Sequence, residues 1–174
     1  MNDKFYEINV LNQDGSSQNL EEYKGKVLLI VNTATGCGFT PQYKELEAYY
    51  REFKDKGFEV LDFPCNQFAN QAKGNDNEIN QFCSLKYDTT FKRFKKVLVN
   101  GEEKCELFKY LEDNSPYEGK GLKAKFFTKL SHAKENEIRW NFTKFLIDKE
   151  GNIIARFEPT EKMENVKKKI SELL

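Results

Sequence analysis

The sequence lacks the features of several protein classes. It carries no excess charge, because 28 Lys and Arg balance 28 Asp and Glu, so the basic surface of a nucleic-acid-binding protein is not expected. Its longest aliphatic run, residues 27–31, is far shorter than the roughly 20 residues that span a bilayer. The opening residues, Met1 to Lys4, do not begin the apolar stretch of a secretory signal. We therefore expect a cytoplasmic protein with no nucleic-acid partner and no stable membrane insertion.

Metal ligands are equally scarce. The chain has one histidine, His132, and no C-x-x-C pair among its four cysteines, which stand at positions 37, 65, 83 and 105. Structural zinc sites need four Cys or His ligands in closely spaced pairs, so no metal site is expected. Four cysteines in a chain of this length are also too few for a disulfide scaffold. The thiols are therefore of interest as single reactive groups.

Apolar residues, by contrast, are plentiful enough for a core. Hydrophobic residues make up 39% of the 174 residues and the chain contains 15 Phe, which excludes a disordered chain. No repeat or Pro/Gly-rich linker divides the sequence, so we expect a single domain over residues 1–174.

Periodicity and turn residues predict the order of the helices and strands. Two apolar strands enclose a helix whose expected N-cap is Thr40, and this arrangement predicts a right-handed crossover with parallel strands. A β-hairpin is expected at the N-terminus, and the chain ends with two more helices, a second hairpin and a last helix. By analogy, this is the order of an α/β thioredoxin-like fold with a central mixed sheet flanked by helices. The predicted ranges are 6–11, 27–31, 41–54, 58–63, 76–87, 105–111, 142–147, 153–157 and 161–174.

Cys37 stands where a reactive thiol is expected. It lies between Gly36 and Gly38, after the strand at 27–31 and before the helix at 41–54. Sites in open α/β sheets gather at this edge, and the N-terminus of the helix favours a thiolate. The alternative is an inert cysteine in a glycine turn. Because structural cysteines usually lie inside an element on its apolar face, we favour the functional interpretation.

Three segments carry a resemblance to a known family. Residues 31–43 (VNTATGCGFTPQY), 63–68 (FPCNQF) and 140–146 (WNFTKFL) resemble, in this order, the signatures of the glutathione peroxidase family. The resemblance runs along nearly the whole chain. The short segment between Gly119 and Trp140 resembles the monomeric branch of the family, so a monomer is expected.

The resemblance implies a peroxidase in which the Cys37 thiolate attacks a hydroperoxide and becomes a sulfenic acid. The family surrounds this sulfur with a Gln, a Trp and an Asn, which correspond here to Gln71, Trp140 and Asn141. The indole N–H and the side-chain amides are neutral donors that can stabilise the thiolate and the departing oxygen. Gln67 in the same loop is the alternative to Gln71, and a lone Trp can also be a core aromatic.

A second thiol is needed to reduce the sulfenic acid. By resemblance, Cys83 stands where thioredoxin-dependent members of the family carry their resolving cysteine. A disulfide requires Cα atoms within roughly 7 Å, so we predict local unwinding around Cys83 before it can bond to Cys37. The alternative is that Cys83 packs as a small hydrophobic residue. Cys65 is expected to be structural, and Cys105 has no predicted role.

The sequence thus predicts a thiol peroxidase that reduces hydrogen peroxide and organic or lipid hydroperoxides. Thioredoxin is the expected reductant, and no cofactor is expected besides the thiol co-substrate. Three alternatives stay open at this point. The protein could be a glutathione-dependent peroxidase that uses one cysteine, an oxidant sensor that passes a disulfide to a partner protein, or a thioredoxin-fold binding module with a vestigial thiol.

Overall fold

A five-stranded mixed sheet forms the centre of the molecule. The structure is a computed structural model that describes residues 1–116, 129, 133–134 and 136–174, so His132 lies outside the described residues. The strand order is β5-β4-β3-β6-β7, with β3 parallel to β4 and antiparallel to β6. A separate hairpin precedes the sheet in the chain. The strands are β1 (Asn9–Leu11), β2 (Ser17–Asn19), β3 (Val27–Thr33), β4 (Phe58–Pro64), β5 (Lys92–Arg93), β6 (Lys144–Ile147) and β7 (Ile153–Phe157).

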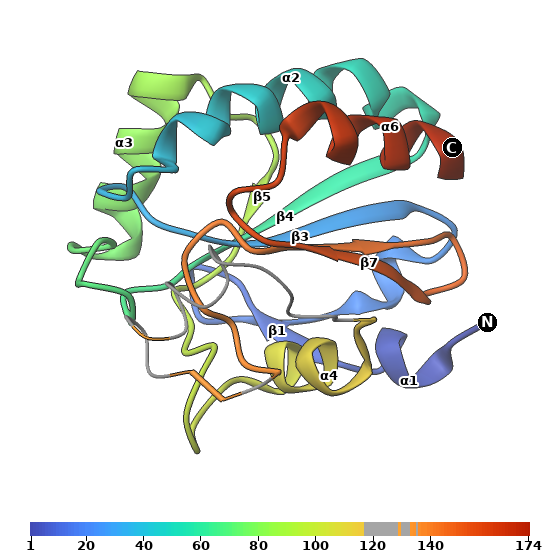
Figure 1. Cartoon of the computed structure of the whole chain (residues 1–174), viewed down its shortest axis with the longest axis horizontal. Helices are drawn as coiled ribbons and strands as arrows, with labels where there is room; N and C mark the ends of the chain where they lie inside the picture. Colours follow the sequence, from blue (N-terminus) through green and yellow to red (C-terminus); the bar gives the residue numbers. More distant parts are fainter. Residues whose placement is uncertain (117–128, 130–132, 135) are drawn as a thin grey trace.

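Helices cover both faces of this sheet (Figure 1). On one face, α2 and α6 lie side by side and α3 lies beyond the end of α2. On the other face lie α1, α4 and the N-terminal hairpin. The helices are α1 (Asp3–Tyr6), α2 (Tyr43–Phe53), α3 (Asp76–Tyr87), α4 (Glu106–Asn114) and α6 (Met163–Leu173), and short 3₁₀ turns span Leu20–Tyr23, Thr40–Gln42 and Lys54–Lys56.

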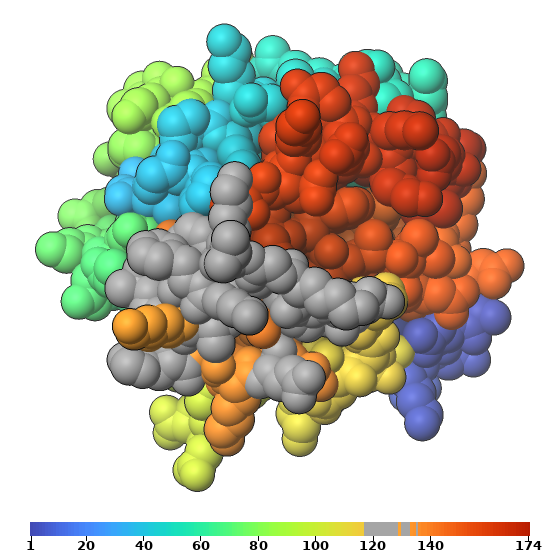
Figure 2. Space-filling model, in the orientation of Figure 1, coloured from blue at the N-terminus to red at the C-terminus, as the bar shows by residue number. Residues whose placement is uncertain are grey.

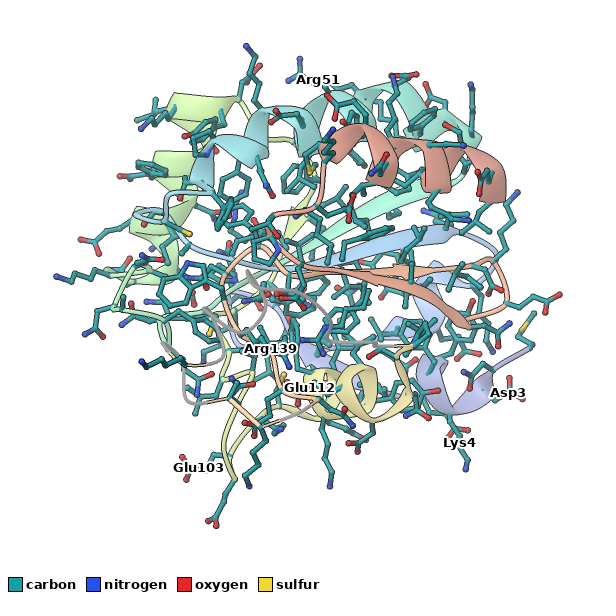
Figure 3. The ribbon with its side chains drawn as sticks, in the orientation of Figure 1. Asp3, Lys4, Arg51, Glu103, Glu112 and Arg139 are labelled. Atoms are coloured by element: carbon teal, nitrogen blue, oxygen red, sulfur yellow. The ribbon has the colours of Figure 1, made fainter. Side chains whose placement is uncertain are left out.

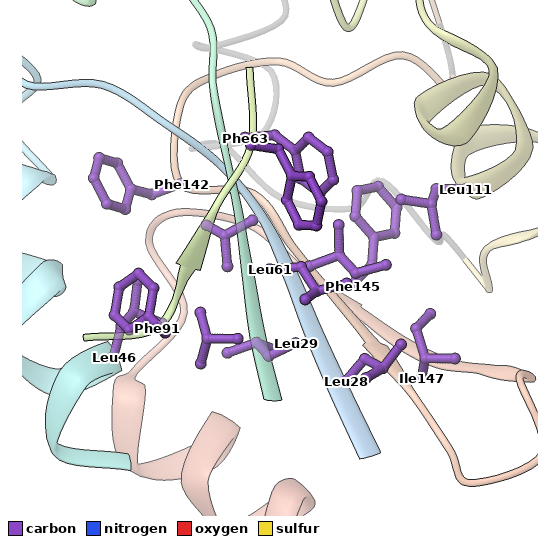
Figure 4. Close-up of a cluster of buried hydrophobic side chains, with 14 of the residues drawn as sticks. Leu28, Leu29, Leu46, Leu61, Phe63, Phe91, Leu111, Phe142, Phe145 and Ile147 are labelled. Atoms are coloured by element: carbon purple, nitrogen blue, oxygen red, sulfur yellow. The ribbon is translucent and has the colours of Figure 1, made fainter. Parts of the chain in front are cut away.

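The core consequently has two layers, one on each face of the sheet. All seven residues of β3 are buried, as expected for a central strand covered on both sides. Leu29 lies on the face that α2 covers, near Leu46, whereas Leu28 lies on the face of α4, near Phe145 (Figure 4). A fully buried β3 gives the loop that leaves its carboxyl end a rigid starting point.

The predicted order of elements is confirmed, with differences at their ends. The predicted helix at 41–54 begins as a 3₁₀ turn, and Thr40 does not cap α2. The last β-hairpin begins at Lys144, because Phe142 adopts a left-handed conformation (φ 68°) that a strand cannot contain. Sequence analysis missed α1 and β5, since elements of four and two residues carry no periodicity.

None of the helices in the described part of the chain combines the length and the apolar character that crossing a membrane requires.

Candidate active site

Cys37 lies in the loop at the carboxyl end of β3, with 6% of its surface exposed. The Cys37 N–H donates to Thr40 Oγ1 at 2.9 Å, and the same hydroxyl donates to the Ala34 carbonyl at 2.8 Å. The Phe39 N–H points at the Cys37 sulfur, with a nitrogen–sulfur distance of 3.4 Å. Thr40, predicted as a helix cap, therefore closes the cysteine loop instead, and the loop presents the sulfur at a fixed position.

Trp140 and Asn141 reach the same place from the turn that precedes β6. Asn32, at 0% exposure on β3, holds this turn: its Nδ2 donates to the Trp140 carbonyl at 3.3 Å, and its own carbonyl accepts the Phe142 N–H at 2.6 Å. The Trp140 side chain hydrogen-bonds with the Cys37 thiol. The left-handed conformation of Phe142 turns the chain so that both preceding side chains lie beside the cysteine loop and the following strand enters the sheet.

Gln71 joins this group from the loop that follows β4. Its carbonyl accepts the Gly36 N–H at 2.8 Å, and its Oε1 accepts the Asn141 Nδ2 amide at 3.2 Å. A side chain at position 36 would place its Cβ 3.2 Å from the Gln71 carbonyl oxygen, so a larger residue there would push the Gln71 backbone away by a few tenths of an ångström. The structure thus brings together all four residues that the sequence singled out: Cys37, Gln71, Trp140 and Asn141.

Gln67, the alternative to Gln71, has a different task. Its Oε1 accepts the N–H groups of Val99 (2.7 Å) and Asn100 (3.0 Å), and its Nε2 donates to the Asn100 carbonyl at 2.9 Å. The Gln67 amide therefore mainly holds the backbone at 99–100, and its oxygen also lies 3.6 Å from the Cys65 sulfur. Gln71 is the glutamine that faces the cysteine loop.

Electrostatics at the sulfur differ from the expectation. Burial raises the pKa of the Cys37 thiol, and the Phe39 N–H, the Trp140 side chain and the charge of Lys144 oppose this shift without reversing it. The predicted lowering of the thiol pKa by a helix N-terminus is therefore wrong. The physical reason is that α2 begins only at Tyr43, after the intervening 3₁₀ turn, while the loss of water around a buried sulfur acts directly.

Lys144 is a charged neighbour that sequence analysis missed. It lies in β6 with no exposed surface, and its Nζ donates to the Phe142 carbonyl at 2.7 Å. Burial lowers its pKa to about 7, with Glu158 as the first of several acidic groups that oppose the shift. The sequence did contain a sign of this residue, since Lys144 interrupts the apolar segment 142–147. A fully buried lysine is rare unless it is paired, so such a position indicates a specific role. Near neutral pH the Lys144 side chain is therefore partly a charged ammonium and partly a neutral amine, and the neutral amine could accept a proton.

Cys83, the predicted second thiol, is fully buried on α3. Tyr43, Asp62 and Arg93 lie close enough to affect the protonation of its thiol. Burial raises the pKa of Cys83 to about 11. Both cysteines are free thiols in this structure, so it represents the reduced state and the predicted disulfide stays a prediction. Cys65 is also fully buried, with a pKa raised by burial to about 11.

Metal ligation plays no visible part in this arrangement. Among the residues that the structure describes, no three His, Cys, Asp or Glu side chains are grouped so as to hold a metal ion. The groups around Cys37 are amides, an indole and one lysine. Such a set can stabilise an anionic sulfur and a departing oxygen by hydrogen bonding.

Comparison with known proteins identifies this arrangement. A model of the glutathione peroxidase family matches residues 5–112, which is more than half of the chain. The chain belongs to the glutathione peroxidase family. The predicted family is thereby confirmed, and with it a peroxidase that reduces hydroperoxides at the expense of a thiol.

Individual members of the glutathione peroxidase family match along the whole chain. The glutathione peroxidase of Lactococcus lactis is 45% identical over 170 residues, covering 98% of this chain and 99% of that protein. The hydroperoxy fatty acid reductase gpx1 of Synechocystis is 44% identical over 173 residues, covering 99% and 97%. The crystal structure of T. cruzi GPX1 is 32% identical with a TM-score of 0.72, covering 97% of this chain and 95% of that chain.

The fold of this family member is also shared more widely. The structure of a thioredoxin-family thiol:disulfide interchange protein from Chlorobium tepidum is 13% identical with a TM-score of 0.63, which shows the fold alone. The predicted thioredoxin-like fold is thus confirmed. The chemical roles of the four grouped residues and of Cys83 remain predictions.

Proposed function

We propose that this member of the glutathione peroxidase family works by a two-cysteine cycle, in which Cys37 reduces the hydroperoxide, Cys83 resolves the product, and thioredoxin restores both thiols. One observation carries the proposal. Cys37 lies in a loop fixed by Thr40 and Gln71, next to the Trp140 side chain and the Asn141–Gln71 amide pair. This places neutral hydrogen-bond donors beside a largely buried sulfur.

In the first step the Cys37 sulfur attacks the terminal oxygen of the hydroperoxide. An S–O bond forms as the O–O bond breaks, and Cys37 is oxidised by two electrons to a sulfenic acid. The thiol proton ends on the departing oxygen, so an alcohol leaves, or water when the substrate is hydrogen peroxide. The indole and amide donors stabilise the anionic sulfur and the leaving oxygen as negative charge moves between them.

In the second step the Cys83 sulfur attacks the Cys37 sulfur. The S–S bond forms while the S–O bond breaks, and the hydroxyl group takes the Cys83 proton and leaves as water. Because Cys83 is fully buried on α3, this step needs a local opening of that helix. A thioredoxin dithiol then supplies two electrons and two protons and restores both cysteines, which places the cycle in a reducing compartment such as the cytoplasm.

Organic and lipid hydroperoxides are the proposed substrates alongside hydrogen peroxide. The similar Synechocystis protein is named a hydroperoxy fatty acid reductase, which supports this substrate class. The Gly36-Cys37-Gly38 loop adds little side-chain bulk beside the sulfur, which suits a substrate with a large organic group.

The test combines intact-mass analysis with coupled turnover. After one equivalent of peroxide, the parent should lose two hydrogens and yield a Cys37–Cys83 peptide pair, and Cys83→Ser should gain one oxygen instead. Turnover with thioredoxin, thioredoxin reductase and NADPH should exceed turnover with glutathione and its reductase. Cys83→Ser should lose the thioredoxin-dependent turnover, whereas Cys65→Ser, which changes another fully buried cysteine, should keep it.

The alternatives give different results. If Cys83→Ser turned over with glutathione as fast as the parent turned over with thioredoxin, the one-cysteine mechanism would replace this proposal. If oxidised parent reacted poorly with both reductants but formed mixed disulfides with other proteins, the sensor interpretation would hold instead.

A further inference from the structure

The α3 helix, which carries Cys83, has little apolar attachment to the rest of the protein. Of its twelve residues, Ile79 and Cys83 are buried. It lies at one edge of the molecule (Figures 1 and 2), and Leu85 on its outer side is 88% exposed. Burial of two modest side chains contributes far less than the apolar faces of α2 or α6. Phe82 and Tyr87 add partly buried packing, and Tyr87 contacts the Tyr43 ring. Polar contacts therefore contribute a larger share of the attachment of α3 than they do for α2 or α6.

A buried ion pair lies between α3 and the sheet. Arg93 Nε donates to Asp62 Oδ2 at 2.7 Å, and the two side chains are 5% and 1% exposed. Asp62 is anchored in β4, where its carboxylate also accepts hydrogen bonds from the hydroxyls of Tyr43, at 3.0 Å, and Thr33. The carboxylate is thus held by three donors, Thr33 and Arg93 from the sheet and Tyr43 from α2.

The same guanidinium reaches α3 with its other two nitrogens. Nη1 donates to Asn80 Oδ1 at 2.6 Å, and Nη2 donates to Thr89 Oγ1 at 3.0 Å. Asn80 lies on α3 one turn before Cys83, and Thr89 follows the end of the helix. Arg93 therefore ties the sheet to α3 on both sides of Cys83 through charge-assisted hydrogen bonds, which are the strong kind.

Space is available for α3 to leave. An open groove of about 810 Å³ runs beside the helix and is lined by Asn80, Leu85, Thr89 and Arg93 among others. Movement of α3 into this groove would displace little packed core. The movement would break the two hydrogen bonds from Arg93, together with contacts at the ends of the helix: Gln13 binds Asn80 and the Asp76 carbonyl, and Arg51 pairs with Asp88.

We propose that the Asp62–Arg93 ion pair is a clamp that holds α3 on the sheet and so sets the rate at which Cys83 reaches the oxidised Cys37. Asp62 and Arg93 are then positioning residues for the second chemical step, with no part in the attack on the hydroperoxide. The inference rests on the proposed two-cysteine cycle.

The charges of the pair also act directly on Cys83, and the design of the test has to cancel this effect. Asp62 raises the pKa of Cys83 and Arg93 lowers it. Removing both charges together leaves these opposite contributions balanced. It also avoids an unpaired buried charge, whereas replacing a buried ion pair by neutral groups is often tolerated.

The experiment measures the two chemical steps separately. Reduced protein is mixed with one equivalent of peroxide, quenched in acid at successive times and analysed by intact mass, so that gain of oxygen and loss of two hydrogens give the two rates. The variant is Asp62→Asn with Arg93→Met, in which the introduced amide oxygen can still accept from Thr33 or Tyr43. Disulfide formation should accelerate about tenfold, the factor expected for losing one net hydrogen bond to a charged group, while sulfenic acid formation stays within twofold.

The matched control is the ion pair of Lys104 and Glu112 on the other face of the sheet. Lys104 Nζ lies 2.6 Å from Glu112 Oε2. Glu112 is on α4, and Figure 3 shows it on the opposite side of the sheet from Arg51, which marks the face covered by α2. Lys104→Met with Glu112→Gln removes a partly buried pair of the same type. This double variant should lose stability yet form the disulfide at the parental rate.

A milder variant keeps the proposal testable if the double variant does not fold. Asn80→Ala removes one of the ties to α3 and leaves the ion pair intact, so disulfide formation should accelerate by about threefold, a smaller factor than in the double variant. Alkylation of Cys83 in the reduced protein should accelerate by the same factor, because both reactions need the helix to open.

The outcomes separate the clamp from the cycle. If the parent forms no Cys37–Cys83 disulfide, the proposed cycle fails and the clamp with it. If the parent forms the disulfide and neither Asp62→Asn/Arg93→Met nor Asn80→Ala changes its rate, or the control pair changes it equally, the clamp fails alone.

Discussion

The two thiols of the proposed cycle lie in opposite surroundings. Cys37 is in a glycine-flanked loop at the end of a sheet strand, with uncharged donors around its sulfur and a small exposed area. Cys83 is on a helix, fully buried, with a carboxylate and a guanidinium close by. The loop of Cys37 is fixed by hydrogen bonds within the loop and by one to the Gln71 carbonyl, whereas the helix of Cys83 is tied to the sheet by Arg93 and to other segments by contacts such as Asn80 with Gln13.

The difference indicates a division of labour. The first thiol must meet a small oxidant, so its geometry is preorganised and open at one side. The second thiol must stay unreactive until the first is oxidised, and burial together with a pKa near 11 achieves this. Preorganisation serves the first step, and controlled opening serves the second.

The largest expected effect concerns the thiol that starts the cycle. Cys37→Ser should lower kcat/KM for hydroperoxides by at least about 10³, because a serine hydroxyl cannot form the sulfenic acid. The measurement is peroxide consumption with thioredoxin as reductant. Cys105→Ser, which changes a partly exposed cysteine with no predicted role, should keep parental activity. Equal peroxide consumption by Cys37→Ser and the parent would remove the basis of the mechanism.

Alkylation of the reduced protein tests the contrast between the two environments. Cys37 should react with iodoacetamide at least about 100-fold faster than Cys83, because labelling of Cys83 must wait for a local opening. Peptide mass mapping over time gives both rates, and in concentrated urea the two cysteines should react alike. Comparable labelling in the folded protein would contradict the burial of Cys83.

The two glutamines of one loop offer the next test. Gln71→Ala should lower kcat/KM for hydroperoxides by about tenfold, since it removes the partner of the Asn141 amide beside the sulfur. Gln67→Ala should instead lower the free energy of unfolding by roughly 1–3 kcal/mol and leave kcat/KM within twofold, because its amide holds the backbone at 99–100 rather than the Cys37 loop. The reverse pattern would exchange the roles of the two residues.

The smallest expected effect comes from Lys144 and depends on pH. Its pKa is about 7 in the folded protein, against an ordinary value of 10.5. Between these values the unfolded chain binds a proton that the folded protein does not, so the free energy of unfolding rises with pH by up to about 1.4 kcal/mol per unit. Below pH 7 Lys144 is charged in the folded protein as well, so the full free-energy cost of burying its ammonium reduces the stability. Lys144→Met should therefore be more stable than the parent at pH 6–7, and the gap should narrow toward pH 9.

Urea unfolding at each pH measures this gap. Lys168→Met, which changes an exposed lysine on α6, provides the control and should differ from the parent by a constant amount. A gap for Lys144→Met that stays constant between pH 6 and 9 would mean that Lys144 keeps its charge in the folded state.

Much of the fold was accessible from the sequence because its signals are local. The apolar run at 27–31 and the periodic segments at 41–54 and 161–174 gave β3, α2 and α6 to within a few residues. The two-residue β5 was not predictable, since it is defined by pairing with β4 and not by its own composition.

The sequence predicted which residues form the site, but it did not predict their contacts or their electrostatics. The resemblance supplied Cys37, Gln71, Trp140 and Asn141, with Gln67 as the alternative to Gln71 because both lie in one loop. Only contacts with distant parts of the chain separate these two glutamines. The thiol pKa was predicted with the wrong direction, since desolvation depends on the packing of the whole chain around the sulfur. The partnership of Asp62 with Arg93 likewise depends on strand register, which no local pattern reveals.

The hydrogen bonds of Asn32 have a consequence for the order in which the active site forms during synthesis. Its side chain and carbonyl fasten the turn of Trp140 and Phe142 to the strand that leads to Cys37. During synthesis Cys37 leaves the ribosome long before that turn does. Until the turn at Trp140 has docked on β3, the nascent chain carries a cysteine without its indole neighbour, so we expect full reactivity toward peroxides only after residues 140–147 have joined the sheet.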